Sequence, residues 1–132
     1  MSILTDELAE DHAAILKLLD QAGAEGVETR TGQETLRTAK EVLLSHFRKE
    51  DTVVYPALMK ASEKDIDIRQ MLNVFLLDLE SITRSAMQFL DTYCDGGAPE
   101  GFKKDLDSFK KALRDRIYKE ESVLYTRYDA LY

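Results

Sequence analysis

The two histidines of the chain, His12 and His46, are the residues whose type and placement point most directly to chemistry. Each falls where a helical pattern calls for an apolar core residue. Glu50 follows His46 by four residues, so both side chains project from one face of one helix. A buried carboxylate needs a cation, a proton or several hydrogen-bond donors. One interpretation is a metal ion shared by imidazole and carboxylate; the other, favoured for His12 taken alone, is a histidine hydrogen-bonded within the core.

A near-repeat adds a second clue. The segment HFRKEDTVVYP, residues 46–56, is matched seventy positions later by RIYKEESVLYT, residues 116–126. The two segments share Lys, Glu, an acidic residue, Ser or Thr, Val and Tyr in the same order, but Arg116 stands where the first segment has His46. A residue that can bind a metal ion is thus replaced by one that is permanently charged.

Four amphipathic helices, separated by loops with helix-breaking residues, are expected to position these side chains. The pattern predicts them over about residues 5–22, 33–59, 65–93 and 99–128. Thr5 is the predicted N-cap of the first helix. Pro56 should bend or end the second, because proline lacks a backbone donor. No segment alternates as a strand would, so we expect an all-α, up-down-up-down four-helix bundle that forms a single domain, residues 1–132.

Composition narrows the classes of function. With 132 residues, 44% of them apolar and 33% charged, the chain can build one core. The net charge of −7 comes from dispersed acids, and no Lys/Arg cluster suits phosphates, so we expect no nucleic acid partner. No basic leader or long apolar run is present, so we expect no membrane partner either. The single cysteine, Cys94, favours a reduced, cytoplasmic location.

Three motifs resemble the hemerythrin-like (HHE cation-binding) domain family. They are EDHAAI around His12, LLSHFRKEDTVVYP around His46, and IYKEESVLY in the last helix, and the resemblance extends along the whole chain. In that family a four-helix bundle holds two irons bridged by two carboxylates. The resemblance implies that His12 and His46 are metal ligands and that Glu50 and Glu121 are the carboxylates. Glu120 and Glu121 both lie beside the inner stripe of the fourth helix, and the family pattern favours Glu121.

The resemblance also implies three further histidines, and this sequence lacks all of them. Arg116 stands at the fourth-helix position, and Phe75 and Leu79 stand at the two third-helix positions. In the family these three histidines serve one iron, so one half of the site would be lost. Arg116 would place a positive charge at the lost ion, and its planar fork would hydrogen-bond the oxygens of Glu50 and Glu121.

Three arrangements of this site are open. In the first, one iron, manganese or zinc ion is bound by His12, His46, Glu50 and Glu121, while Arg116 takes the surplus oxygen lone pairs. In the second, no metal is bound, Arg116 pairs with the carboxylates and one histidine carries a proton. In the third, two ions are held with the help of waters or unexpected ligands.

The family implies oxygen binding, iron handling, or sensing of oxygen, nitric oxide or redox state. Carriage of oxygen by an iron pair is not expected, because the iron with the open position has lost its histidines. We expect a mononuclear metal-binding protein, a sensor or scavenger rather than an enzyme, with a diatomic molecule or peroxide as ligand. The alternative is a metal-free interaction or signalling module with an unknown protein partner. A phosphotransfer module fits poorly, because Glu50 and Asp51 beside His46 would repel phosphate.

Overall fold

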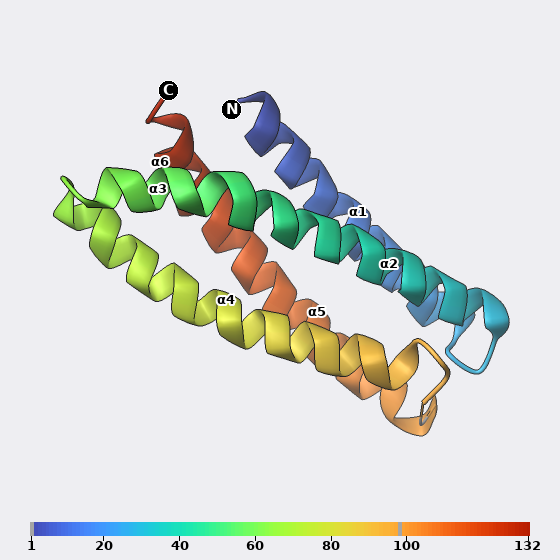
Figure 1. The fold of residues 1–132 in the computed structure, drawn as a ribbon. Coiled ribbons are helices and arrows are strands. Elements are labelled where there is room, and N and C mark those ends of the chain that lie inside the picture. Colours follow the sequence, from blue (N-terminus) through green and yellow to red (C-terminus); the bar gives the residue numbers. More distant parts are fainter. Residues whose placement is uncertain (1, 98) are drawn as a thin grey trace.

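Four helical arms run alternately up and down around a common core (Figure 1). The structure, a computed structural model, describes residues 2–97 and 99–132. The arms are α1 (Ile3–Glu25); α2 (Arg30–Lys49) with η1 (Glu50–Val54) and α3 (Tyr55–Ser62); α4 (Ile66–Tyr93); and α5 (Pro99–Lys119) with η2 (Glu120–Leu124) and α6 (Tyr125–Asp129). The described residues contain no strand, and the predicted all-α bundle is confirmed.

The first helix begins earlier than its apolar pattern predicts. Ser2 is the N-cap, and its hydroxyl accepts a hydrogen bond from the backbone N–H of Thr5 at 3.2 Å. Thr5 lies inside α1, is buried, and donates its hydroxyl to Asp129 Oδ2 at 2.9 Å. The prediction of Thr5 as the N-cap is therefore wrong: Ser2 satisfies the free backbone donor, and Thr5 links the first arm to the last.

The second arm passes through Pro56 without ending there. The five residues before Tyr55 form the π-helix η1, and Pro56 occupies one of the first two positions of α3, where a missing backbone donor costs little. The fourth arm contains the same device, because η2 covers Glu120–Leu124. The near-repeat of the sequence is therefore a repeated π-turn, a feature that often accompanies functional sites in helices.

Two apolar clusters fill the bundle, and a polar layer separates them along its length. One cluster lies toward the connections of α1 with α2 and of α4 with α5, and it includes Leu19, Leu36, Leu43, Phe89, Phe109 and Leu113. The other lies toward the termini and includes Leu8, Leu58, Leu72, Leu124 and Tyr128. On three arms buried polar residues fall between the two sets: His12 on the first, His46 and Glu50 on the second, and Arg116 and Glu120 on the last. The core therefore positions a polar site in the middle of the molecule.

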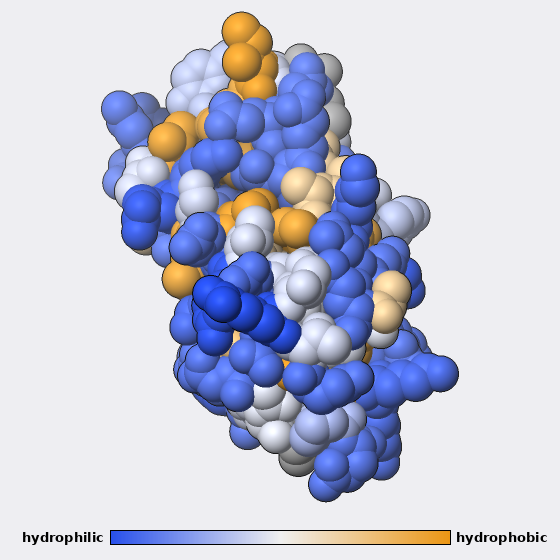
Figure 2. Space-filling model, turned by 90° about the vertical axis from the view of Figure 1, so that its right-hand side faces the viewer, coloured by the Kyte–Doolittle hydropathy of each residue, from blue (hydrophilic) through white to orange (hydrophobic). Residues whose placement is uncertain are grey.

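The surface is mainly polar. Figure 2 shows a face on which hydrophilic side chains predominate and apolar ones are scattered. No helix of the described ranges combines the length and apolar character that crossing a membrane requires. This finding bears on membrane-spanning helices alone. The expectation that the protein has no membrane partner stays a prediction.

Candidate metal centre

Two histidines and two carboxylates converge in the polar layer. His12 comes from α1, His46 from α2, Glu50 from η1 and Glu120 from η2, and all four are buried. The Nε2 atoms of His12 and His46 are 3.1 Å apart. Glu120 Oε1 lies 2.8 Å from His12 Nε2 and 3.6 Å from His46 Nε2. Glu50 Oε2 lies 3.4 Å from His46 Nε2. Ligand atoms from three arms therefore face one another in the buried interior.

The outer nitrogen of each histidine faces a further carboxylate. His12 Nδ1 lies 2.7 Å from Glu121 Oε2, and His46 Nδ1 lies 3.2 Å from Asp11 Oδ2. An ionised carboxylate only accepts hydrogen bonds, so each Nδ1 carries hydrogen and donates it. When neutral, imidazoles held in this way direct their Nε2 lone pairs inward, as metal-ligating histidines with an outer carboxylate do.

Hydrogen-bond acceptors outnumber donors in the interior of this group. Glu50 Oε1 is buried and has no hydrogen-bond partner in the described part of the chain. Burial by itself lowers the pKa of His46, but hydrogen bonds and charge from Glu120 and Glu50 outweigh it and raise this pKa to about 10. Burial raises the pKa of the Glu50 carboxyl. A positive charge is therefore required at the centre, and either a proton or a metal ion can supply it.

Arg116 supplies a fixed positive charge on one side only. Its Nε donates to Glu120 Oε2 at 2.9 Å, its Nη2 to the Tyr55 hydroxyl at 2.6 Å, and its Nη1 to the Phe75 carbonyl oxygen at 3.1 Å. Burial opposes ionisation of Glu120, but hydrogen bonds from the histidines and the charge of Arg116 hold its pKa well below the usual value. The predicted bonds from Arg116 to Glu50 and Glu121 are absent among the described residues. Tyr55 and the Phe75 carbonyl take those donors instead.

Protein side chains fill the half of the site for which the sequence lacks the expected histidines. The guanidinium carbon of Arg116 lies 4.9 Å from the ring centroid of Phe75, which is buried. Leu79 is partly buried and packs against both apolar clusters. These side chains occupy one side of the polar layer, and the two histidines occupy the other.

The inward carboxylate of the last arm is Glu120, which corrects the expectation of Glu121. The Glu120 side chain is 2% exposed, and the Glu121 side chain is 37% exposed. Regular α-helix continues from Arg116 to Lys119, so the residue four positions after Arg116 stays on its face and the residue five positions after it turns outward. The repeat contained this signal, because it pairs Glu120 with Glu50, and each of these residues begins a π-helix.

Sequence reasoning also missed Tyr125, which the repeat pairs with Tyr55. The Tyr125 hydroxyl lies inside the centre and donates to Glu50 Oε2 at 2.8 Å. Burial, followed by the charges of Glu120 and Glu50, raises the pKa of Tyr125 far above its usual value. Tyrosines at helical spacing near a chain end commonly pack over the end of a bundle. The pairing with Tyr55 in the repeat is the signal that singles out Tyr125.

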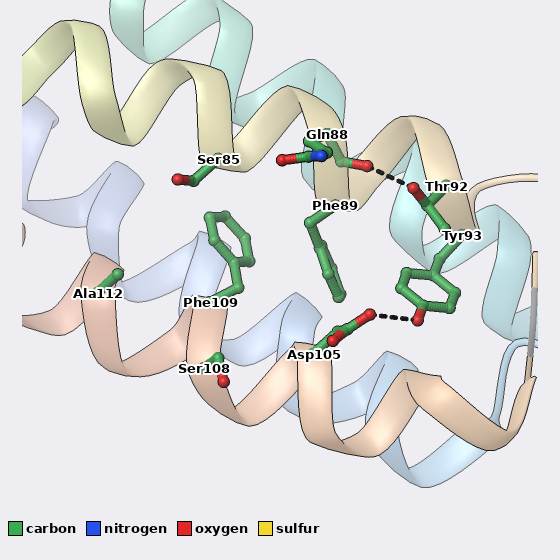
Figure 3. A pocket seen from close by; sticks show the side chains of 9 residues that line it. All are labelled: Ser85, Gln88, Phe89, Thr92, Tyr93, Asp105, Ser108, Phe109 and Ala112. Carbon is green, nitrogen blue, oxygen red and sulfur yellow. Dashed lines mark hydrogen bonds between the residues drawn. The ribbon is translucent and has the colours of Figure 1, made fainter.

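Two clefts lie along the seam between α4 and α5, apart from the centre. The larger, of about 400 Å³, includes Phe89, Phe109 and the bond from the Tyr93 hydroxyl to Asp105 (Figure 3). The smaller, of about 230 Å³, shares Ser85 and Ala112 with it and is also lined by Arg116.

The sequence as a whole matches one family description. Residues 3–128 match the model of the hemerythrin HHE cation binding domain. The chain therefore belongs to this family, whose description indicates binding of a metal cation. Comparison with curated proteins and with solved structures found no significant match. Within the structure, the ligand atoms of His12, His46 and Glu120 all lie within 4.8 Å of one another and could hold such a cation.

Proposed function

We propose that the protein binds one metal ion through His12, His46, Glu50 and Glu120 and uses it to sense or handle a diatomic molecule, peroxide or the cellular redox state. Two imidazole nitrogens and two carboxylate oxygens suit iron, and also manganese or zinc. Iron is the first candidate because of the family. The proposal keeps the expected half-site and replaces Glu121 by Glu120. The cytoplasmic location expected from the sequence remains part of the proposal.

The observation that carries the proposal is the pair of facing Nε2 atoms, 3.1 Å apart. If both imidazoles are neutral and donate from Nδ1 to Glu121 and Asp11, each Nε2 keeps a lone pair. Two lone pairs at this separation, beside two carboxylates, repel one another unless a cation lies between them. A metal ion there would satisfy all four groups at once.

Each surrounding residue has a role in this arrangement. Glu121 and Asp11 orient the imidazoles, and Arg116 keeps Glu120 ionised and turns its Oε1 toward the histidines. The bound ion would supply a Lewis acid, and for iron also an electron donor or acceptor. Arg116 and Phe75 fill the other half of the site, which favours one ion over two.

A metal-free network is the second candidate, and the raised pKa of His46 favours it. With a pKa of about 10, His46 would carry a proton at neutral pH, and this charge would compensate the carboxylates without a metal ion. The domain would then be an interaction or signalling module with an unknown protein partner. The retained polar layer would reflect specificity rather than stability.

Metal content per chain tests the two candidates. The protein is prepared without a chelator or histidine tag, loaded separately with ferrous iron, manganese and zinc, and analysed for bound metal. We expect about one ion per chain, and its loss in His46→Ala, because the substitution removes an inward nitrogen.

The neighbouring pair Glu120→Gln and Glu121→Gln provides a matched comparison. We expect Glu120→Gln to lose most of the metal, because it removes a ligand. Glu121→Gln should keep the ion with about 10–100-fold weaker affinity, because it changes only the partner of His12. Two ions per chain would contradict the mononuclear site. No bound metal under any loading condition would leave the metal-free module.

A further inference from the structure

The hydroxyl of Tyr125 lies among all four inward donor atoms. Its distances are 2.8 Å to Glu50 Oε2, 3.1 Å to Glu120 Oε1, 3.2 Å to His12 Nε2 and 3.5 Å to His46 Nε2. The Tyr125 side chain is completely buried. A hydroxyl that only donates a hydrogen bond from outside would approach one acceptor closely, whereas this oxygen is near all four.

The Tyr125 oxygen lies at distances from the four donors that are typical of donors sharing one ion. Donors about 2.1 Å from an ion lie about 3.0 Å apart at a right angle and about 3.6 Å apart at 120°. The separations from Tyr125 Oη to the four donors run from 2.8 to 3.5 Å, and those among His12 Nε2, His46 Nε2 and Glu120 Oε1 run from 2.8 to 3.6 Å. Tyr125 therefore has the spacing of a further ligand beside the group formed by His12, His46 and Glu120.

The fold also holds the Tyr125 ring in place. The ring stacks against His12, with centroids 5.7 Å apart and planes 13° apart. Tyr125 directly follows η2, whose first residue is Glu120. The π-helix thus brings a carboxylate and a phenol, five positions apart in sequence, to the same centre.

Tyr55 is the counterpart of Tyr125 in the repeat, but its hydroxyl is already bound by another group and is not available to a metal ion. The Tyr55 hydroxyl accepts from Arg116 Nη2 at 2.6 Å, so that phenol already has a cation beside it. Tyr125 occupies the half of the centre in which no guanidinium donates to the phenol. A cation bound at the histidines would stand beside Tyr125 as Arg116 stands beside Tyr55.

We propose that Tyr125 is a fifth protein ligand of the metal ion and binds ferric iron as a phenolate. This rests on the proposed function and deepens it, because three anionic oxygens and two imidazoles favour ferric over ferrous iron. When the bond between iron and Oη forms, the phenol proton passes to solvent, and no electron is transferred if the iron is supplied as ferric. The protein would then hold its iron in the oxidised state.

Visible spectroscopy with ferric citrate as the iron source tests this. After loading and removal of excess iron, the wild type should show a phenolate-to-iron charge-transfer band, and resonance Raman excitation in that band should show phenolate ring modes. Tyr125→Phe should retain bound iron, measured by elemental analysis, and lose the band. The matched variant Tyr55→Phe should keep both, because its hydroxyl contacts Arg116 rather than the four donors.

Failure of this inference and failure of the proposed function give different results. About one iron per chain without phenolate modes, or a band that survives Tyr125→Phe, would overturn the role of Tyr125 and leave the metal site intact. No bound metal in the wild type would overturn both. If Tyr125→Phe does not fold, the wild-type Raman spectrum decides, since Tyr125 is the tyrosine whose hydroxyl meets the four donors.

Discussion

At the scale of single residues, Arg116 and His46 occupy matching positions of the repeated segment but belong to opposite halves of the centre. Arg116 directs its three nitrogens to Glu120, Tyr55 and the Phe75 carbonyl. His46 directs one nitrogen outward to Asp11 and the other inward. One half thus carries its own cation, and the other must acquire a proton or a metal ion. Arg116, at the position where the family has a histidine ligand, thus places a permanent positive charge of the protein itself beside Glu120.

Removal of the built-in cation should destabilise the metal-free protein strongly. Arg116→Met leaves Glu120 Oε2 buried without its partner, and loss of one member of a buried ion pair costs about 3–5 kcal/mol. The free energy of urea unfolding, measured with a chelator present, checks this. Arg84→Met is the matched control, because Arg84 and Glu80 also lie four residues apart but are about 70% exposed. The control should lose about 0.3–0.5 kcal/mol. Equal losses in the two variants would contradict a buried pair.

At the scale of elements, the connection between α1 and α2 determines how His46 is placed relative to His12. Gly26 ends α1 with φ of 84°, a conformation that favours glycine. Thr29 caps α2 by accepting from the backbone N–H of Gly32 at 3.0 Å. The backbone of Gly32 packs closely against Gly26: a Cβ atom at Gly32 would lie 1.8 Å from the Gly26 carbonyl oxygen. The loop therefore depends on two glycines for two different reasons.

Gly32→Ala should disturb this connection. The added methyl group meets a backbone oxygen that cannot rotate away, and overpacking of this kind costs about 1–3 kcal/mol. Gly23→Ala is the control, because its Cβ would meet only the end of the Leu106 side chain, at 2.9 Å. There the better helix propensity of alanine, up to about 1 kcal/mol, offsets the contact. Chemical denaturation of both variants checks the prediction. It fails if the two alanines have the same effect.

At the scale of the whole molecule, contacts between the chain ends close the bundle next to the second apolar cluster. Asp129, the last residue of α6, accepts from the Thr5 hydroxyl at 2.9 Å and from the backbone N–H of Ser2 at 3.3 Å. Leu8 and Tyr128 pack within the cluster beneath this contact. The position of α6, and with it that of Tyr125, is thereby coupled to the start of α1, which carries His12.

Stability should depend on pH through this contact. Burial alone would raise the pKa of Asp129, but hydrogen bonds from Ser2 and Thr5 outweigh it and hold the pKa below its ordinary value of 3.8. A carboxyl group with a lowered folded-state pKa contributes stability that is fully present above the unfolded pKa and is lost as pH falls through the folded pKa. Asp129→Asn should therefore be less stable than wild type at pH 7, and the difference should shrink as pH falls below about 4.

Urea unfolding midpoints of the metal-free proteins, measured from pH 7 down to about pH 3, check this linkage. Asp107→Asn is the control, because Asp107 is an exposed side chain on α5. The unfolding midpoint of Asp107→Asn should stay close to that of the wild type over the whole pH range. A gap between wild type and Asp129→Asn that stays constant or widens on acidification would show that the carboxylate does not stabilise this end of the bundle.

Helical periodicity predicts the four helices and the inward positions of His12, His46 and Glu50, because it decides which face of a helix each side chain occupies. Periodicity also left Glu120 and Glu121 both beside the inner stripe, and it said nothing about what a phenol or guanidinium would touch. The packed bundle reveals that Glu120 faces the centre, that Arg116 donates to Tyr55, and that Tyr125 lies among the four donors. Such contacts depend on the rotation and register of each helix against its neighbours, which the π-turns and core packing set together.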